Sequence, residues 1–537
     1  MDFKKLIQSD GSCVIPKRKS IPDNAFFGCK ELKTVVIPAG VERIGREAFM
    51  NCLNLKSVTI PDGVKAIEER AFDNCFELTG IELPSTVNHI GNEVFRGCKK
   101  LERIKLPELV KTIPIEAFVS CAGLKSIELP EGLEEIQAMA FYNCTSLREL
   151  NIPEKVQFLD ETAFIGCAGL EKMTVHSGNL EYCSEENAIL SKDKEILLFG
   201  CQNSRIPNGV KEIAEYAFEG ISTLKSIEIP SSVYDIIFNS FKGCTGLEKI
   251  TVDKENQIYR SENNCLLDMY GELIAGCKTS IIPQGVKMIG SEAFYGIKGL
   301  TEIVIPDSVE EISYEAFWGT GIKKIDIPSS VKSIFSDAFS GCEQLNAITV
   351  SENNPNYSSS GNCLLSKDGK KLIQGCLSSI IPDTVEEIDW HAFSFYKELS
   401  HIFIPASVKK IDVCDFWMCS NLSSIEVDPK NPYFCSDGNC LLTADRKHLI
   451  RGCKTSIIPE GVTTINPGAF YECDSLENII LPDSVTDIGN KAFAGCTNLS
   501  SITLPEDVNI EVEAFADCYK LLGHPELKEF DCSLWLG

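Results

Sequence analysis

The sequence has no apolar run near the length of about 18 residues that a membrane-spanning helix needs. Its first residues, MDFKKLIQSDGSC, contain two lysines but lack the apolar stretch of a secretion signal. We therefore expect no membrane insertion. As the sequence stands, it indicates a cytoplasmic protein; a cell-surface or secreted location is the alternative if a leader has been removed.

Motifs of common enzyme sites are also missing. The sequence has no G-x-x-x-x-G-K-[ST], G-x-G-x-x-G, H-E-x-x-H or G-x-S-x-G segment. It has no C-x-x-C pair, and its six histidines are scattered, which gives a zinc site little support. Paired glutamates such as Glu134-Glu135 and Glu310-Glu311 recur in the register of a repeat, which is typical of solvated edges. We expect a protein that is not an enzyme and needs no metal or cofactor.

Basic residues are too few to balance the acidic ones. The chain has 51 Lys and Arg against 77 Asp and Glu, which leaves a net charge of −26. Such a surface repels the phosphate backbone, so the sequence predicts no nucleic-acid partner. A basic protein partner fits this charge better.

What the sequence does have is a repeat with a period of 23 residues. The unit reads L-x-x-[IV]-x-[IL]-P-x-x-V-x-x-I-x-x-x-A-F-x-x-C. Its phenylalanine occurs 17 times, at positions 26, 49, 72, 95, 118, 141, 164, 218, 241, 294, 317, 339, 393, 416, 470, 493 and 515. A fixed period of this length with Leu and Ile at set positions is typical of a leucine-rich-repeat solenoid.

The local pattern of the unit predicts the course of each coil. L-x-x-I-x-I-P alternates apolar and polar residues and ends at proline, which favours a short strand. V-x-x-I predicts a second extended piece, and A-F-x-x-C a single helical or 3₁₀ turn. One coil is too small to bury its apolar side alone, so coils must stack. We expect one curved α/β-type array of about 17 coils, mostly short parallel strands with turns and 3₁₀ segments.

The segment LPDSVTDIGNKAFAGCTNLSSITLP at 481–505 resembles the BspA-type, or Treponema pallidum-type, leucine-rich repeats. The resemblance covers the chain from about Ile21 to Cys518. It implies a curved solenoid with a parallel sheet on its concave side that recognises proteins. Members of the family are often surface adhesins that bind host matrix proteins or other bacteria.

Four similar inserts interrupt the period, at about 178–206, 255–282, 353–381 and 430–458. Each begins with an asparagine and contains two apolar runs separated by turn residues, which predicts a β-hairpin. An insert either enlarges its coil and sets the curvature, or projects as part of a binding edge; the sequence leaves both open. The domain limits that we expect are an N-terminal cap (1–20), the solenoid (21–518) and a C-terminal cap (519–537), in which Phe530, Leu534 and Trp535 fold back over the last coil.

Thirteen cysteines follow the repeat phenylalanine by three residues, and Ile221, Ile297, Thr320 and Tyr396 replace them in the other copies. Isoleucine and tyrosine at this position indicate a buried slot that reduced cysteines fill. We predict a structural column formed by residues such as Phe49, Phe72, Phe95, Phe118, Phe141, Cys52, Cys75, Cys98, Cys121 and Cys144.

Aromatic residues concentrate at 389–419, where two of the four tryptophans lie. Aromatic side chains in partly exposed rows are favoured as interface anchors. The candidate partner-binding residues are Trp390, His391, Tyr396, His401, Phe403, Trp417, Trp318 and Tyr295. The alternative is that these side chains cover the convex side of the solenoid against water.

We expect a monomeric, non-enzymatic scaffold that binds a protein partner. The favoured hypothesis is adhesion to a host or bacterial protein. The alternative is an intracellular immunity or adaptor protein whose acidic surface binds a basic partner.

Overall fold

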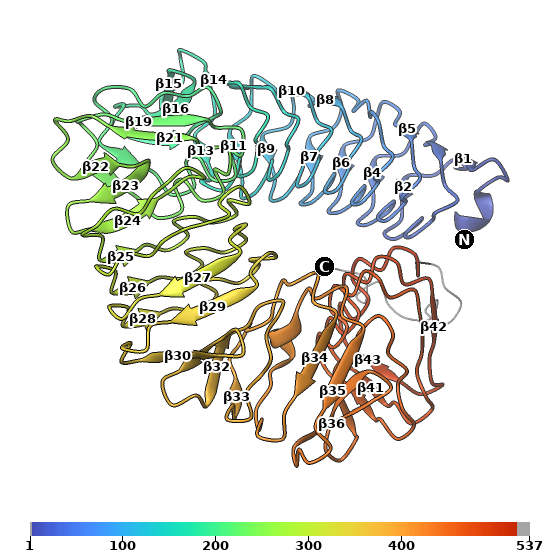
Figure 1. The fold of residues 1–537 in the computed structure, drawn as a ribbon. Helices are drawn as coiled ribbons and strands as arrows, with labels where there is room; N and C mark the ends of the chain where they lie inside the picture. Colours follow the sequence, from blue (N-terminus) through green and yellow to red (C-terminus); the bar gives the residue numbers. More distant parts are fainter. Residues whose placement is uncertain (1–2, 523–537) are drawn as a thin grey trace. The chain divides into compact units, whose positions relative to one another are not determined.

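The structure, a computed structural model, describes residues 3–522. It contains two compact units, Met1–Met269 (unit 1) and Tyr270–Gly537 (unit 2). Each unit is a β-solenoid of stacked coils (Figure 1), so the predicted fold class is confirmed. Phe530, Leu534 and Trp535 of the expected C-terminal cap lie outside the described residues.

The first strand of most coils comes from the L-x-x-I-x-I-P segment and pairs in parallel with the equivalent residues of the next coil. Thr34, for example, pairs with Ser57, which follows it by one period of 23 residues. In unit 1 these strands are β1 (Ser12–Val14), β3 (Thr34–Val36), β5 (Ser57–Thr59), β8 (Arg103–Lys105), β10 (Ser126–Glu128), β12 (Glu149–Ile152), β14 (Lys172–Val175), β19 (Ser226–Ile229) and β21 (Lys249–Val252). In unit 2 they are β27 (Lys324–Ile327), β29 (Ala347–Val350), β34 (His401–Ile404), β35 (Ser424–Val427), β40 (Asn478–Ile480) and β42 (Ser501–Thr503).

The second strand of a coil comes from V-x-x-I and is only two residues long. Its isoleucine points inward and the residue before it outward, as at Arg43 and Ile44. In unit 1 these strands are β2 (Ser20–Ile21), β4 (Arg43–Ile44), β6 (Ala66–Ile67), β7 (His89–Ile90), β9 (Thr112–Ile113), β11 (Glu135–Ile136), β13 (Phe158–Leu159), β18 (Glu212–Ile213) and β20 (Asp235–Ile236). In unit 2 they are β25 (Met288–Ile289), β26 (Glu311–Ile312), β28 (Ser333–Ile334), β33 (Glu387–Ile388), β39 (Thr464–Ile465), β41 (Asp487–Ile488) and β43 (Asn509–Ile510).

The A-F-x-x-C part of the repeat forms hydrogen-bonded turns. Among residues 3–522 the only helical segments are two 3₁₀ helices, η1 (Phe3–Leu6) before the first coil and η2 (Val413–Phe416). The expected helical turn is therefore present only at η2. In the other coils the residue before the cysteine often has a left-handed backbone, with φ of 58° at Asn51 and 67° at Gly97. Asn and Gly tolerate this conformation best, which explains why the cysteine so often follows one of them.

The repeat phenylalanines stack inside each unit. Phe49 and Phe72 have centroids 5.2 Å apart with nearly parallel planes, and the stacking continues through Phe95, Phe118 and Phe141. In unit 2, Phe294, Phe317 and Phe339 stack in the same way. Burying one large apolar side chain stabilises a fold by roughly 1.5–3 kcal/mol, so this column contributes strongly to cohesion between coils.

The cysteines form a second column beside the rings. The Cys52 thiol donates to the Phe26 carbonyl at 3.1 Å, and the Cys121 thiol donates to the Phe95 carbonyl at 3.0 Å. All 24 described cysteines are free. Burial raises the pKa of the Cys167 thiol to about 12. The Cys167 thiol therefore remains protonated, and the column thiols serve as small buried hydrogen-bond donors.

The inserts add strands to the sheets instead of forming separate modules. Their strands are β15 (Tyr182–Glu185), β16 (Ala188–Ser191) and β17 (Ile196–Phe199); β22 (Tyr259–Glu262), β23 (Cys265–Asp268) and β24 (Glu272–Ala275); β30 (Tyr357–Ser360), β31 (Cys363–Ser366) and β32 (Lys371–Gln374); and β36 (Phe434–Asp437), β37 (Cys440–Thr443) and β38 (His448–Arg451). In the first, third and fourth inserts, the three strands pair antiparallel with one another. Their last strand then pairs in parallel with a second strand, as β17 does with β18. This geometry favours the enlarged-coil interpretation.

One asparagine clamps each insert to the coil before it. The Asn354 amide donates to the Pro328 and Val331 carbonyls at 2.8 and 3.0 Å. Its side-chain oxygen accepts from the backbone N–H groups of Asn356 and Tyr357, both at 2.9 Å. The equivalent residues Asn179, Asn256 and Asn431 make the same four bonds.

Candidate partner-binding surfaces

In unit 2 seven ring-bearing side chains form what we call the aromatic row: Tyr295, Trp318, Phe395, His391, Trp417 and Tyr471 touch in that order, and Trp390 branches off at His391. The rings of Tyr295 and Trp318 stack with centroids 4.5 Å apart. The Trp417 ring lies 5.5 Å from His391 and 5.1 Å from Tyr471. Coils that are distant in sequence thus contribute to one continuous row.

Most of the aromatic row is packed rather than open. Only Trp390 is largely exposed, at 56%; Tyr295, Trp318, Phe395 and Trp417 are half-buried. The row therefore covers the turns of its coils and offers a partner mainly the Trp390 ring.

Polar groups are buried next to this row. His391 Nδ1 lies 3.9 Å from Asp337 Oδ1, and both side chains are about nine-tenths covered. Burial raises the pKa of Asp337, and the nearby His391 acts against that rise. Asp415 is fully buried and accepts from the Asp412 N–H at 2.7 Å as part of a capping box on η2. Burial raises the Asp415 pKa to about 8. Asp415 caps η2 through its other oxygen, whereas Asp415 Oδ1 and His391 Nδ1 are buried without a hydrogen-bond partner among residues 3–522.

The backbone of this region is strained. Phe395 and Met418 occupy the position that is Gly or Asn in many other coils, with φ of 68° and 58°. His391 is also left-handed, with φ of 64°. A left-handed backbone costs a residue other than glycine on the order of 1–3 kcal/mol. The surrounding packing must offset this cost.

The eight residues predicted from the sequence fall in three places. Tyr295, Trp318, Trp390, His391 and Trp417 lie in the aromatic row, whereas His401 and Phe403 point outward from β34. Tyr396 corrects the expectation: it is fully buried, and its hydroxyl donates to the Gly375 carbonyl at 3.0 Å. Tyr396 fills the cysteine slot of its coil, so it has no surface to offer a partner.

A second candidate surface is the outward side of the first strands, which we call the strand face. In unit 2 it carries six large apolar side chains at one repeat position, four residues after the Leu or Cys that begins each coil. They are Ile281 (66% exposed), Val304 (78%), Ile380 (74%), Phe403 (42%), Ile457 (75%) and Ile480 (72%). They occur as three pairs, 281/304, 380/403 and 457/480, and the members of a pair are one 23-residue period apart. We call them the apolar pairs.

Unit 1 has a different strand face. At the same register it carries Val14 and Val36, which are both exposed, followed by Thr59, Glu82, Lys105, Glu128, Asn151, Thr174, Arg205, Glu228 and Thr251. Arg205 and Glu228 occupy the place of an apolar pair after the first insert. Sequence reasoning singled out Phe403 alone among the six apolar residues. The Ile-Ile-Pro triplets that begin at 281, 380 and 457 were a signal that could have identified three others.

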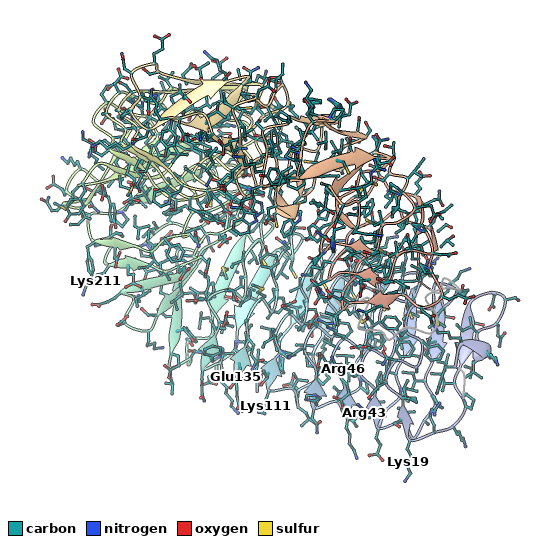
Figure 2. The ribbon with its side chains drawn as sticks, turned by 90° about the horizontal axis from the view of Figure 1, so that it is seen from below. Lys19, Arg43, Arg46, Lys111, Glu135 and Lys211 are labelled. Carbon is teal, nitrogen blue, oxygen red and sulfur yellow. The ribbon has the colours of Figure 1, made fainter. Side chains whose placement is uncertain are left out.

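Charged side chains line the second-strand side of unit 1, where Lys19, Arg43, Lys111 and Glu135 follow one another along the solenoid (Figure 2). Many of the charges on this side are paired between coils. Arg43 lies 2.7 Å from Glu68, and Lys111 lies 3.3 Å from Glu134. The recurring glutamates are thus explained by ion pairs at the coil edges, without catalytic chemistry. Among residues 3–522, no cluster of three or more His, Cys, Asp or Glu side chains could hold a metal ion.

Stacked coils with short parallel strands, a phenylalanine column and a cysteine column define a leucine-rich-repeat solenoid protein. The family model of the BspA-type leucine-rich repeat region matches in six copies, at residues 19–123, 111–188, 199–269, 275–366, 369–437 and 450–524. The chain therefore belongs to the BspA-type leucine-rich repeat proteins, and the resemblance seen in the sequence is confirmed. It is a protein-interaction scaffold of that family, whose members are generally non-enzymatic and typically occur at bacterial cell surfaces.

Similar solved structures are bacterial leucine-rich repeat proteins. A leucine-rich cell surface protein of Faecalibacterium prausnitzii is 24% identical over 78% of this chain and 88% of that chain, with a TM-score of 0.40. A leucine-rich repeat protein of Bacteroides ovatus is 25% identical over 74% and 91%, with a TM-score of 0.37. The Treponema pallidum leucine-rich repeat protein is 36% identical over 30% and 79%, with a TM-score of 0.29. A search of curated proteins found no match. Within residues 3–522, no helix is both long enough and apolar enough to cross a bilayer.

Proposed function

We propose that this protein mediates adhesion by binding a host or bacterial protein through the strand face of unit 2. The observation that carries the proposal is the set of three apolar pairs. Single exposed apolar residues are common on protein surfaces, but here they recur as pairs on successive coils, with Asp326, Thr349 and Glu426 at the same repeat position between the pairs. Exposed apolar patches bordered by polar residues mark sites of protein interaction, and each pair is such a local patch.

The strand face suits a protein partner physically. Its β-branched side chains stand on short strands or on the extended segments before proline, so little conformational entropy is lost when they are covered. Full burial of one such side chain contributes roughly 1.5–3 kcal/mol. Phe403 supplies the aromatic anchor of the row, and His401 lies on the same strand. Trp390, the exposed branch of the aromatic row at His391, is proposed as a further contact.

The setting we propose for this activity is the cell surface, where the family typically occurs, with the protein acting as a monomer. The net charge of −26 argues against a nucleic-acid partner. The same charge favours the second candidate function, an intracellular immunity or adaptor protein that binds a basic partner. Binding to a basic protein that weakens by about tenfold or more between 50 and 500 mM salt would support that candidate, because salt screens charge attraction.

The test uses the full chain and a panel of purified matrix proteins and intact bacterial cells. Affinity is measured for the wild type and for the double variant Ile457→Thr/Ile480→Thr, which keeps the β-branched shape and removes apolar surface. Loss of one apolar pair should weaken binding by about tenfold or more.

The matched control is Val36→Thr, which changes the same repeat position in unit 1 at a side chain that is 44% exposed. It should leave binding unchanged. If the double variant binds every panel member as tightly as the wild type, the strand face of unit 2 is not the adhesive surface.

A further inference from the structure

The ladder of first strands in unit 1 has a gap at residues 79–83. β5 pairs with β3 on one side, and β8 pairs with β10, but no first strand forms between β5 and β8; the strands labelled between them in Figure 1, β6 and β7, are second strands. The intervening segment makes only an isolated bridge from Gly80 to Arg103. In several other coils a backbone N–H reaches the next coil at this place, as Ile37 N–H does to the Thr59 carbonyl at 3.0 Å and Leu106 N–H to the Glu128 carbonyl at 3.1 Å.

The equivalent bond is missing at the gap. Ile60 N–H would donate to the Glu82 carbonyl, yet neither group has a backbone partner among the described residues. A paired edge strand would have used both groups. They remain available to the main chain of a ligand.

A groove of about 1000 Å³ lies over this gap. Its walls come from four successive coils and include Thr59, Glu82, Arg103, Lys105 and Glu128. Gly80 makes the groove possible: a Cβ added there would meet nothing within 4 Å. Neighbouring coils carry Thr34, Ser57, Arg103 and Ser126 at this position, so the missing side chain leaves the space open.

The charges on the groove walls are of two kinds. Lys105 and Glu128 of the walls pair with each other at 3.0 Å, and Glu102 of the walls pairs at 3.0 Å with Lys125, which lies outside the lining. Arg103 and Glu82, by contrast, are exposed and have no ion pair or side-chain hydrogen bond among residues 3–522. An open guanidinium and an open carboxylate therefore face the groove from adjacent coils.

We propose that this groove binds an internal extended peptide segment with an acidic and a basic side chain two residues apart. The acidic side chain pairs with Arg103 and the basic one with Glu82. Glu82 and Arg103 lie on neighbouring coils and two positions apart along them, a diagonal of about 7–8 Å. Alternate side chains of an extended chain lie about 6.6 Å apart on one face, which fits that diagonal.

The length of the groove suits such a segment. Its walls run from β5 to β10, three coil spacings, or about 14 Å at about 4.8 Å for each spacing. About four extended residues span this length. Ile60 N–H and the Glu82 carbonyl would bond the main chain of the segment. The site is separate from the strand face of unit 2 and does not depend on the adhesive function.

The test measures how tightly the full chain binds eight-residue peptides that are N-acetylated and C-amidated. Four sets of peptides carry Glu-x-Lys, Lys-x-Glu, Glu-x-Glu or Lys-x-Lys at the centre. The two mixed sets should bind about tenfold more tightly than the two like-charged sets, because each charged pair is matched only there. Equal binding by all four sets, or no binding, overturns the proposal. Tighter binding by peptides with a free C-terminal carboxylate and no glutamate would show a site for chain ends and would also overturn it.

Three variants sharpen the test. Arg103→Glu should shift the preference to Lys-x-Lys peptides, and Glu82→Lys should shift it to Glu-x-Glu peptides. Gly80→Thr, which installs the residue type of position 34, should fill the groove and weaken binding of the mixed peptides by about tenfold. Glu228→Lys, at the repeat position of Glu82 but outside the groove, is the control and should change nothing. Wild-type selectivity in all three groove variants, with unchanged melting temperatures, overturns the proposal.

Discussion

The interiors of units 1 and 2 are built in the same way, but their strand faces differ. Ring centroids are 5.2 Å apart both for Phe49 and Phe72 in unit 1 and for Phe294 and Phe317 in unit 2, and both units bury the cysteines of the column. After the first insert the outward pair is Arg205 and Glu228, whereas the other three inserts are followed by the apolar pairs. The outward side chains touch no neighbouring core, so they can diverge without cost to the stack. The comparison teaches that the columns build the solenoid and that the strand face distinguishes one unit from the other.

The largest expected effect tests whether the inserts are built alike in the two units. Asn354→Ala in unit 2 and Asn179→Ala in unit 1 each remove four hydrogen bonds and leave buried backbone groups unpaired. An unsatisfied buried group costs about 1–3 kcal/mol, so each change should lower the free energy of unfolding by about 4 kcal/mol. Chemical denaturation of the full chain measures this.

Asn151→Ala is the control for the asparagine variants, because that side chain is exposed; it should change the free energy by less than about 0.5 kcal/mol. If one asparagine variant lowers the free energy of unfolding much more than the other, the inserts of the two units are not built alike.

The next prediction concerns a difference on the turn side. Asp415 precedes the repeat phenylalanine, where unit 1 has buried alanines such as Ala71 and Ala140. Burial raises its pKa from 3.8 to about 8, so the folded state keeps a proton that the unfolded state loses. The contribution of Asp415 is therefore fully present below pH 3.8 and is lost as the pH rises to about 8.

The measurement is the free energy of unfolding from pH 5 to 7. The wild type should lose up to about 1.4 kcal/mol per pH unit relative to Asp415→Asn, which carries no titrating group and can still accept from the Asp412 N–H. Asp483→Asn, at an exposed turn, serves as the control. Parallel pH profiles for the wild type and Asp415→Asn would show that Asp415 is ionised in the folded state.

A slightly smaller loss of stability is expected when alanine replaces a glycine that lies against the phenylalanine column. A Cβ on Gly200 in unit 1 would lie 2.0 Å from the Phe218 ring, and one on Gly375 in unit 2 would lie 2.1 Å from the Phe393 ring. Gly200→Ala and Gly375→Ala should each destabilise the fold by about 1–3 kcal/mol through overpacking.

The control for these two variants is Gly80→Ala, whose Cβ meets nothing within 4 Å. Its melting temperature should stay close to that of the wild type. If Gly200→Ala and Gly375→Ala lower the stability by different amounts, the phenylalanine column is not packed in the same way beside the two inserts.

Sequence reasoning succeeded where burial repeats with the period. Phe72 and Cys75 recur because each coil needs the same filler, so the solenoid class follows from the pattern. It failed at Tyr396, because a local concentration of aromatics indicates nothing about depth; its position in the cysteine slot was the better guide. The gap at residues 79–83 could not be predicted from the sequence, because Gly80 looks like any other small residue at an outward position. Whether a ladder bond forms there depends on how neighbouring coils fit, which one sequence position does not reveal.

The smallest effect on stability comes from transferring the strand face of unit 2 to unit 1. Arg205→Ile/Glu228→Ile recreates an apolar pair after the first insert. Because both side chains are exposed, the free energy of unfolding should change by less than about 0.5 kcal/mol for each substitution. The same two substitutions can also be added to the Ile457→Thr/Ile480→Thr variant. If each apolar pair binds the partner on its own, the added pair should recover part of the affinity that this variant loses. Arg205→Thr/Glu228→Thr removes the same charges without adding apolar surface and should recover none. Recovery by the threonine control as well would show that loss of charge, and not the apolar pair, governs binding.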